Sequence, residues 1–333
     1  MLKFYRIGRL YLRRIIRISD LCSTGEKHTM GMKTETGIEK LSLDEHGFEA
    51  KYYQGRLSPE KAIIATGGAS CNERSSVAMS RYLRQAGYNV LVLGFYMWDG
   101  LSKEMAGIPV DYVENAVKWL REEKKVEKIA MTSISTGAGY TLLCASLIPE
   151  ISCVIPVAPF DHVMEATTNS FKRLNRSVYT WHGEDIPFSP WTLIDEGIPK
   201  IFWRAYKDKR YGLKRFMRYG YDHNTLTEES RIRVENMHAD VLFLAPKDDD
   251  AWPSDEAVLR MVRVLKDNRY PYRLEWKIYD RASHALSDGL DELSGSAKWA
   301  LKHMLPAEKK YPKDCEEARQ DSFRRVLDFL NKW

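Results

Sequence analysis

The sequence has no uninterrupted apolar run that approaches the ~18 residues a membrane-spanning helix requires. Its five cysteines are scattered, without the Cys-x-x-Cys spacing of a zinc site or the density of a disulfide scaffold. Charge is not one-sided either, because 51 Lys and Arg face 46 Asp and Glu, which leaves a net charge of +5. These absences argue against a membrane-spanning protein, a disulfide-stapled secreted domain and a strongly basic nucleic-acid binder. They favour a reducing compartment, and we expect a cytoplasmic protein.

Histidine and cysteine spacings indicate no metal centre. No two of the eight histidines lie at a close ligand spacing with a carboxylate between them. We therefore expect no metal and no bound cofactor. Cys144 and Cys153 lie in apolar runs, where a thiol packs as a small hydrophobic side chain, so we predict that both are buried.

The first 17 residues form a distinct basic segment. They carry Lys3 and five arginines among Leu, Ile, Phe and Tyr, with no acid before Asp20. One interpretation is a basic amphipathic helix that makes weak contact with an anionic membrane surface. The other is a disordered leader over residues 1–33, or translation that starts at Met30 or Met32. The segment lacks the continuous apolar region of a secretory signal, so export is not indicated.

Residues 34–333 predict one large domain, because 44% hydrophobic residues in 333 suffice for a sizeable core. Residues 41–43 and 48–53 flank the turn-rich Asp44-Glu45-His46-Gly47 and predict a β-hairpin. Short apolar runs then alternate with segments of helical periodicity. The expected strands cover residues 62–65, 89–94, 128–132, 151–157, 241–245 and 274–279. The expected helices cover residues 77–87, 111–123, 136–146, 254–267 and 316–331.

Such alternation predicts an α/β fold with a mostly parallel central sheet and helices on both faces. The alternation stops between about residues 160 and 236 and then resumes. An interruption of this length predicts a lid or cap inserted into the domain.

Ser135 lies where an expected strand runs directly into an expected helix. The segment reads Ser133-Ile134-Ser135-Thr136-Gly137, and a sharp strand-to-helix turn around a protruding serine needs small residues on either side. The helix N-terminus that follows favours a developing anion. We therefore predict a nucleophile elbow centred on Ser135, although Ser133 stands where the usual pattern has glycine.

A serine hydroxyl needs a histidine base, and the histidine needs an acid to orient it. In the α/β-hydrolase fold these residues follow in the order Ser, Asp, His. The acidic run Asp248 to Asp250 follows one expected strand, and His284 follows the next. Taken singly, the acidic run also fits a solvated turn, with Ser254 capping the next helix, and His284 fits an exposed loop. Together the three candidates predict an α/β-hydrolase with a Ser-His-Asp triad.

The oxyanion of an acyl-transfer reaction needs backbone donors. One should be the amide of Thr136, and the other should come from the glycine-rich loop after the first central strand, at Gly68 and Ala69. The glycines of that loop fit a tight strand exit equally well. Of the other histidines, His238 precedes a strand, His303 lies in an expected helical stretch, and His162 and His182 could line a pocket in the lid.

From about residue 60 to the C-terminus the chain resembles the α/β-hydrolase domain of the bile acid-CoA:amino acid N-acyltransferase and acyl-CoA thioesterase family. The resemblance rests on Gly94-Phe95-Tyr96 with Gly100-Leu101, the helix from Tyr112 to Leu120, the segment Ser133 to Gly137, Asp248-Asp249 with Trp252-Pro253-Ser254, and Ala282-Ser283-His284. It implies that Ser135 is the nucleophile, Asp249 the acid and His284 the base. Asp249 is favoured over its neighbours because it stands three positions after Pro246, where the family usually has glycine.

The chain departs from this family at several positions. Ser133, Pro246 and Arg281 stand where glycine is common, and residues 1–58 are too few for the β-rich N-terminal domain of many members. Cysteine nucleophiles in the family accompany acyl transfer to amino acids, whereas serine is associated with hydrolysis. Ser135 therefore favours a hydrolase of a small-molecule acyl thioester or ester.

Residues 200–221 in the expected lid are basic and aromatic. Phosphates pair with such cations and a nucleotide base stacks on such rings, so an acyl-CoA would suit them. The candidate substrate-binding residues are Arg204, Lys207, Arg210 and Trp203. The alternative is an amphipathic lid whose aromatics pack inward while its charges face water. RNA binding would use the same residue types, but a patch in a hydrolase cap does not favour a nucleic-acid partner.

Three functions stay open from the sequence. If the protein is an acyl-CoA thioesterase, the basic lid should contribute to substrate affinity, and salt should weaken that affinity. A general carboxylesterase or serine peptidase of the same fold predicts cleavage that is indifferent to salt. A non-catalytic, hydrolase-like binding protein predicts that Ser135, Asp249 and His284 do not converge.

Overall fold

The structure is a computed structural model that describes residues 37–69, 71–168, 170–212, 215–287 and 305–333, with the single positions 295, 299 and 302. The predicted basic leader over residues 1–33, with its membrane-contact segment 1–17, lies outside the described residues, and so does His303.

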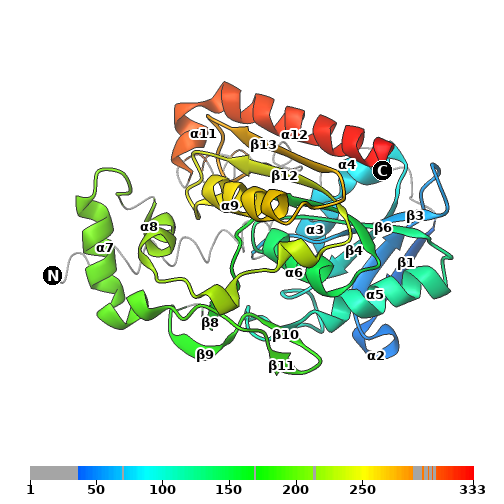
Figure 1. The fold of residues 1–333 in the computed structure, drawn as a ribbon, viewed down its shortest axis with the longest axis horizontal. Coiled ribbons are helices and arrows are strands. Elements are labelled where there is room, and N and C mark those ends of the chain that lie inside the picture. The colour runs from blue at the N-terminus through cyan, green and yellow to red at the C-terminus, as the bar shows by residue number, and fades with distance from the viewer. Residues whose placement is uncertain are drawn as a thin grey trace.

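An eight-stranded sheet forms the centre of the described residues, in the order β1-β2-β4-β3-β6-β7-β12-β13 (Figure 1). The strands are β1 Ile38–Leu41, β2 Glu49–Tyr53, β3 Lys61–Ala65, β4 Asn89–Gly94, β6 Lys128–Ile134, β7 Ile151–Val157, β12 Asp240–Pro246 and β13 Leu274–Tyr279. Strand β2 is antiparallel to both β1 and β4, and the other pairs are parallel. The predicted mostly parallel α/β sheet is confirmed.

The predicted N-terminal hairpin is present, but its first strand lies earlier than predicted, at Ile38–Leu41 instead of residues 41–43, and its loop also differs. Strands β1 and β2 pair with Ile38 opposite Tyr53. The connection is not a bare turn but a single helical turn, α2 Leu43–His46. Gly47 ends it in the left-handed region at φ 75°, a conformation that glycine adopts without steric cost.

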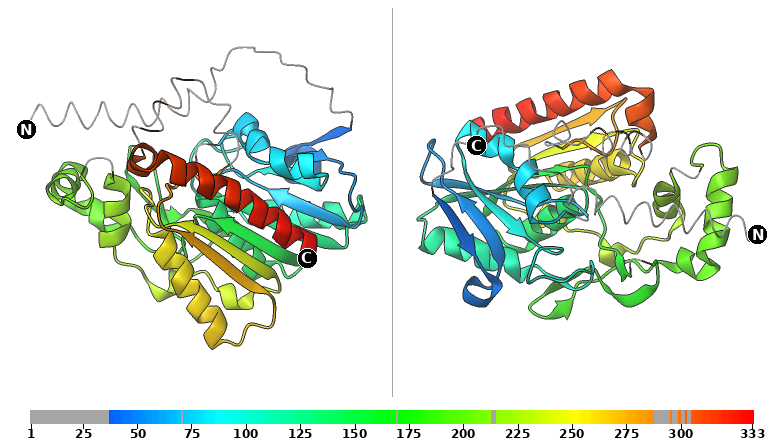
Figure 2. Two further views of the ribbon diagram at one scale, coloured as in Figure 1. Left: turned by 90° about the horizontal axis from the view of Figure 1, so that it is seen from above. Right: turned by 180° about the vertical axis from the view of Figure 1, so that it is seen from behind.

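Helices cover both faces of the sheet (Figures 1 and 2). Helices α3 Glu73–Met79, α4 Arg81–Ala86 and α12 Pro312–Lys332 contribute to the apolar cluster on one face. Helices α5 Asp111–Glu122, α6 Thr136–Leu147 and α9 Ser254–Asp267 contribute to the cluster on the other. None of the helices that the structure describes is both long and apolar enough to cross a membrane.

The helix predicted over residues 77–87 is interrupted. Helix α3 ends at Met79 and α4 begins at Arg81, with Gly87 at φ 96° after its end, as predicted. Two serine hydroxyl groups form hydrogen bonds with the backbone at this break. The Ser80 hydroxyl donates to the Val77 carbonyl, and the Ser76 hydroxyl donates to the Asn72 carbonyl. Such local side-chain bonds compete with the helical ladder.

The stretch between β7 and β12, where the sequence shows no regular rhythm, contains short elements. We refer to residues 158–239 as the β7–β12 segment. Its strands are β8 Glu165–Thr167, β9 Arg173–Ser177, β10 Tyr179–Trp181 and β11 Glu184–Asp185, and β10 also pairs with β5 Ile108–Pro109. Helices α7 Ile198–Lys207 and α8 Phe216–His223 project beyond the sheet at one end of the molecule (Figure 1).

Cys144 on α6 and Cys153 on β7 are completely buried, as predicted. Burial raises the pKa of both thiols, since a thiolate in an apolar environment loses its hydration. Neither cysteine is suited to thiolate chemistry.

The start of α6 packs unusually close to the loop after β3. A Cβ atom at Gly137 would lie 2.1 Å from the backbone oxygen of Gly67 and 2.8 Å from the Thr66 hydroxyl. Only glycine permits this approach, which fixes the loop after β3 against the turn between β6 and α6.

We expect Gly137→Ala to lower the free energy of unfolding by about 2 kcal/mol or more, because backbone must move to accommodate the methyl group. Gly139→Ala, two residues along the same helix, is the matched control. A Cβ there has no neighbour closer than 3.8 Å, and alanine should change stability by less than about 1 kcal/mol. Urea denaturation of both variants measures the difference. Equal stabilities would contradict the close approach.

Candidate active site

Ser135 occupies a strained turn between β6 and α6. Its backbone has φ 63° and ψ −128°, a conformation that costs a non-glycine residue about 1–3 kcal/mol. The Ser135 carbonyl accepts from the amides of Ala138 and Gly139 at 2.9 and 3.3 Å. The side chain is thereby held at the end of β6, immediately before the free amides of the helix start.

The structure brings Ser135, His284 and Asp249 together. His284 Nε2 lies 2.8 Å from Ser135 Oγ, and His284 Nδ1 lies 2.9 Å from each carboxylate oxygen of Asp249. The three residues follow β6, β12 and β13, whose carboxyl ends meet at one edge of the sheet. A serine, an imidazole and a carboxylate in this order can activate a hydroxyl as a nucleophile.

Asp249 is fully buried and held from several sides. Ser254 Oγ donates to Oδ2 at 2.7 Å, and the amides of Ala251 and Trp252 donate to Oδ1 at 2.8 and 3.3 Å. Ser254 therefore orients the carboxylate in addition to beginning α9. The indole of Trp252 donates to the Ala158 carbonyl at 3.1 Å, which ties this loop to the end of β7.

The environment of His284 raises the pKa of its imidazole. Burial by itself opposes the charge, but the Asp249 carboxylate and its hydrogen bond outweigh it, and the nearby Asp250 adds to them, so the pKa of His284 is raised. The Trp252 ring packs edge-on against the imidazole, with centroids 5.2 Å apart and planes at 88°. The imidazole is therefore a stronger base than a free histidine side chain.

The residues predicted for the oxyanion lie on both sides of Ser135. Thr136 is the first residue of α6, and its carbonyl accepts from the Tyr179 hydroxyl at 2.9 Å. A Cβ at Gly68 would lie 3.1 Å from the Ser135 Cβ, so the loop after β3 touches the nucleophile. Ala69 follows directly and is exposed.

Arg215 pairs with protein carboxylates, not with solvent or a ligand as its basic sequence context suggested. It belongs to the basic stretch interpreted as phosphate-binding, yet its guanidinium binds Asp248 Oδ1 at 3.0 Å and Asp250 Oδ1 at 2.8 Å. Arg218, on α8, donates to the Asp249 carbonyl at 3.3 Å and to Glu256 on α9 at 3.1 Å. Two arginines thus join α8 and the turn before it to the loop of the triad acid.

Asp250 lies beside Asp249 and is buried, with its Oδ2 atom lacking a hydrogen-bond partner among the described residues. Burial raises the pKa of Asp250 to about 7, Arg215 opposes this rise, and the charge of Asp249 adds to it. A group that changes charge near neutral pH therefore lies next to the triad.

A cavity of about 160 Å³ opens beside Ser135. Its lining is mainly apolar and aromatic and includes Phe160, Met164, Tyr179, Tyr221 and Trp252. The β7–β12 segment supplies most of this wall. No lysine or arginine belongs to the lining that the structure describes.

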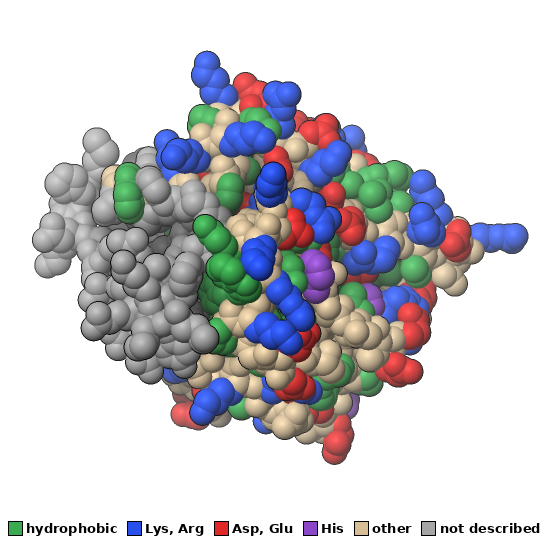
Figure 3. Space-filling model, turned by 90° about the vertical axis from the view of Figure 1, so that its left-hand side faces the viewer, with side chains coloured by type: hydrophobic (Ala, Val, Ile, Leu, Met, Phe, Trp, Pro, Cys, Tyr) green, Lys and Arg blue, Asp and Glu red, His purple; other side chains and the backbone are tan. Residues whose placement is uncertain are grey.

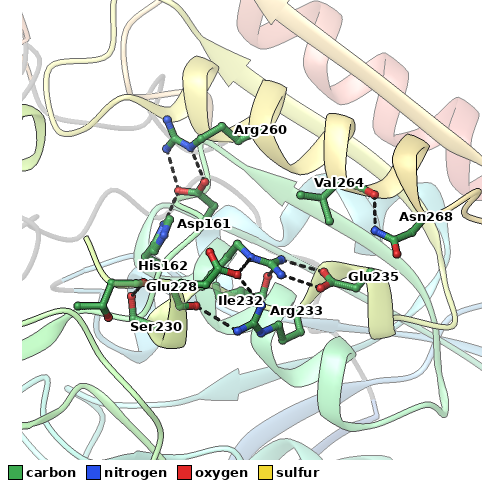
Figure 4. Close-up of polar contacts among 12 residues, drawn as sticks. Asp161, His162, Glu228, Ser230, Ile232, Arg233, Glu235, Arg260, Val264 and Asn268 are labelled. Carbon is green, nitrogen blue, oxygen red and sulfur yellow. Dashed lines mark hydrogen bonds and ion pairs between the residues drawn. The ribbon is translucent and has the colours of Figure 1, made fainter. Parts of the chain in front are cut away.

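His162 is the histidine of the β7–β12 segment that lines this cavity, whereas His182 is exposed and lies outside it. Asp161 accepts from His162 Nδ1 at 3.0 Å and from two guanidinium nitrogens of Arg260 at 2.7 and 2.9 Å (Figure 4). His238 precedes β12, as predicted, and is exposed.

Asp111, Glu114 and His182 are the described residues that could together hold a metal ion, since their ligand atoms lie within 4.8 Å of one another. His182 Nε2 lies 3.1 Å from Glu114, and the His182 amide donates to Asp111. No motif in the sequence indicates this cluster, because His182 lies about seventy residues after Asp111 and Glu114. Solvent-facing groups of this kind commonly lack a metal.

The predicted substrate-binding residues on α7 lie outside the cavity. Arg204 pairs with Glu196 at 2.8 Å, Lys207 lies over the ring of Trp203, and the aromatic Trp203 is itself exposed. The apolar side of α7, with Ile198 and Ile201, faces the cavity instead. Figure 3 faces this side of the molecule, where Lys and Arg side chains are interspersed with hydrophobic ones.

Arg210 differs from these three residues. It binds Asp208 and lines a second cavity of about 400 Å³, together with Arg215, Asp248 and Lys310 of α11 Pro306–Lys310. This second cavity adjoins the loop of the triad acid through Asp248.

Comparison with known families matches residues 108–288 to the sequence model of the family described as BAAT / Acyl-CoA thioester hydrolase C terminal. The peroxisomal succinyl-coenzyme A thioesterase of Mus musculus is 34% identical over 138 residues, which is 40% of this chain and 31% of that protein. Acyl-coenzyme A thioesterase 1 of Rattus norvegicus is 25% identical over 239 residues, 69% of this chain and 49% of that protein. The chain thus spans at most about half of either relative.

Among solved structures, the esterase Pf2001 of Pyrococcus furiosus aligns with a TM-score of 0.50 at 15% identity and covers 92% of this chain and 96% of that one. At this identity the likeness concerns the fold alone. It agrees with the α/β-hydrolase fold predicted from the sequence.

Asp250→Asn should change how stability depends on pH. The folded wild type holds the Asp250 proton up to about pH 7, whereas the unfolded chain releases it near the ordinary value of 3.8, so rising pH favours unfolding. Asparagine removes this dependence. Relative to wild type, the free energy of unfolding of the variant should therefore rise by up to about 1.4 kcal/mol for each pH unit between pH 5 and 7. Above pH 7 the difference between the two proteins should stay constant. Urea denaturation at pH 5, 6, 7 and 8 measures it, and parallel pH profiles would refute it.

Proposed function

The chain belongs to the BAAT / acyl-CoA thioester hydrolase family, and we propose that it hydrolyses an acyl thioester or ester through an acyl-enzyme on Ser135. The observation that carries the proposal is the continuous hydrogen-bond chain from Ser135 through His284 to Asp249. These three hydrogen-bonded residues lie beside an apolar cavity that can hold an acyl group. The non-catalytic alternative is disfavoured, because it required the three residues not to converge.

In the proposed acylation step, Ser135 Oγ attacks the carbonyl carbon while His284 Nε2 takes the hydroxyl proton. Asp249 keeps the other ring nitrogen protonated and stabilises the imidazolium. The Thr136 amide and the loop at Gly68 and Ala69 would stabilise the tetrahedral oxyanion. Collapse of the intermediate expels the thiolate or alkoxide, which receives the proton from His284.

Deacylation repeats these roles with water. His284 accepts a proton from the water that attacks the acyl-enzyme, and then returns it to Ser135 Oγ as the carboxylic acid leaves. Hydrolysis by this route balances protons without a metal or cofactor.

The acyl group is proposed to lie in the cavity beside Ser135, with the β7–β12 segment as its lid. The volume of about 160 Å³ resembles that of a benzene-sized apolar cavity, which suits a group of roughly six carbons. An uncharged acyl group is favoured over a dicarboxylic one, because no cation among the described residues lines the cavity to pair with a second carboxylate.

The second cavity supports a CoA thioester over a simple ester. Arg210 and Lys310 line it, together with Arg215, whose guanidinium already pairs with Asp248 and Asp250. A phosphate can pair with cations such as Arg210 and Lys310. In this proposal the acyl end lies beside Ser135 and a phosphate-bearing leaving group extends to Arg210 and Lys310. A general carboxylesterase or serine peptidase remains the alternative for the same triad.

Ser135→Ala and His284→Ala should each lower kcat/KM for hexanoyl-CoA and for an activated aryl hexanoate by about 10³-fold or more, because each removes a member of the triad. Mass spectrometry of wild type should detect acylation of Ser135. His238→Ala is the matched histidine control, since His238 is exposed and away from the cavity. Turnover that survives both triad substitutions would refute the proposed mechanism.

Arg210→Met combined with Lys310→Met should raise KM for hexanoyl-CoA several-fold and leave KM for the aryl ester unchanged, since only the CoA ester carries phosphates. The effect should shrink at high salt, which screens exposed charges. Arg263→Met, at an exposed position of α9, is the control for loss of a positive charge. An equal rise in KM for both substrates would instead favour the carboxylesterase alternative.

A further inference from the structure

His162 lines the cavity beside Ser135, and among the described residues the hydrogen-bond partner of its ring is Asp161, at Nδ1. We propose that His162 selects acyl groups carrying a hydroxyl group, so that the preferred substrate is a hydroxyacyl thioester; this inference rests on the proposed function. The proposed mechanism does not use His162, and it lies outside the Ser135, His284 and Asp249 chain.

The orientation of His162 is fixed by an ion pair between the buried Asp161 and Arg260. Asp161 is 2% exposed, and Arg260 of α9 occupies both of its oxygens at 2.7 and 2.9 Å. His162 Nδ1 lies 3.0 Å from Oδ1 of the same carboxylate (Figure 4). The backbone is also held, because the Ile232 amide donates to the Asp161 carbonyl and the Val163 amide donates to the Ser230 carbonyl.

Asp161 determines which nitrogen of His162 carries the proton. Burial opposes its charge, but the hydrogen bonds from Arg260 and His162 and the charge of Arg260 outweigh burial and lower the pKa of Asp161. The carboxylate can only accept, so Nδ1 donates, and Nε2 of the neutral ring is then an acceptor. No group among the described residues donates to Nε2.

The rest of the cavity makes this acceptor selective. Glu165, the carboxylate in the lining, is already bound by Arg173 and by the amides of Asn175 and Trp191. The neighbouring lining is apolar and includes Phe160 and Met164. An acceptor left unpaired against an apolar acyl chain costs free energy, whereas a hydroxyl group satisfies it. A keto group only accepts hydrogen bonds, so it cannot donate one to Nε2.

The test compares CoA thioesters that share one leaving group: hexanoyl, its hydroxyhexanoyl position isomers and the matching oxohexanoyl compounds. For wild type we expect kcat/KM for one hydroxyhexanoyl isomer to exceed that for hexanoyl and for its oxo analogue by about tenfold. His162→Phe should abolish this preference, so that kcat/KM becomes similar for the hexanoyl, hydroxyhexanoyl and oxohexanoyl compounds. His182→Phe is the matched control, because His182 is exposed and outside the cavity.

His162→Gln provides a second variant should the phenylalanine variant fail to fold. The glutamine amide offers both a donor and an acceptor, so it should accept hydroxy and oxo groups alike. Wild-type rates that are equal across the panel would overturn the inference and leave the proposed function standing. A uniform loss with His162→Phe would show a structural role and overturn it as well. Absence of Ser135-dependent turnover with every thioester would refute the proposed function, and this inference with it.

Discussion

The strained backbone of Ser135 is the constraint on which the rest of the candidate site depends. A residue at φ 63° and ψ −128° persists only where its surroundings leave no alternative. Here Gly137 packs against the Gly67 carbonyl, and Ser133 bonds the Thr141 hydroxyl at 2.6 Å, so strand, turn and helix are fixed together. The loop bearing Gly68 is held against Ser135 by the same contacts. In this arrangement Ser135 Oγ lies 2.8 Å from His284 Nε2.

The sequence predicted the regular part of the fold closely, because apolar runs bounded by turn residues have one simple interpretation in an alternating α/β chain. Strands β4, β7 and β13 and helix α9 have the predicted bounds. The short strands β8 to β11 escaped prediction because strands of two to five residues are too short to show a period. The break at Ser80 depends on hydroxyl bonds that no hydrophobic pattern records.

Candidate residues at strand ends were predictable, and their long-range partners were not. Ser135, Asp249 and His284 each follow a strand of one sheet, so the fold class alone indicates that they meet. Arg215 binds Asp250, 35 positions away, and Arg260 binds Asp161, 99 positions away. Their sequence neighbourhoods show only a basic stretch and a surface helix. The function of a charge depends on its partner, which folding alone determines.

The link that Arg215 and Arg218 make between α8 and the acid loop has a mechanical consequence. Helix α8 also forms part of the cavity wall, through Phe216, Met217 and Tyr221. The two arginines therefore connect this wall to the loop that carries Asp249. A displacement of α8 would therefore also displace the loop that carries Asp249, so this part of the cavity wall and the carboxylate can be expected to move together.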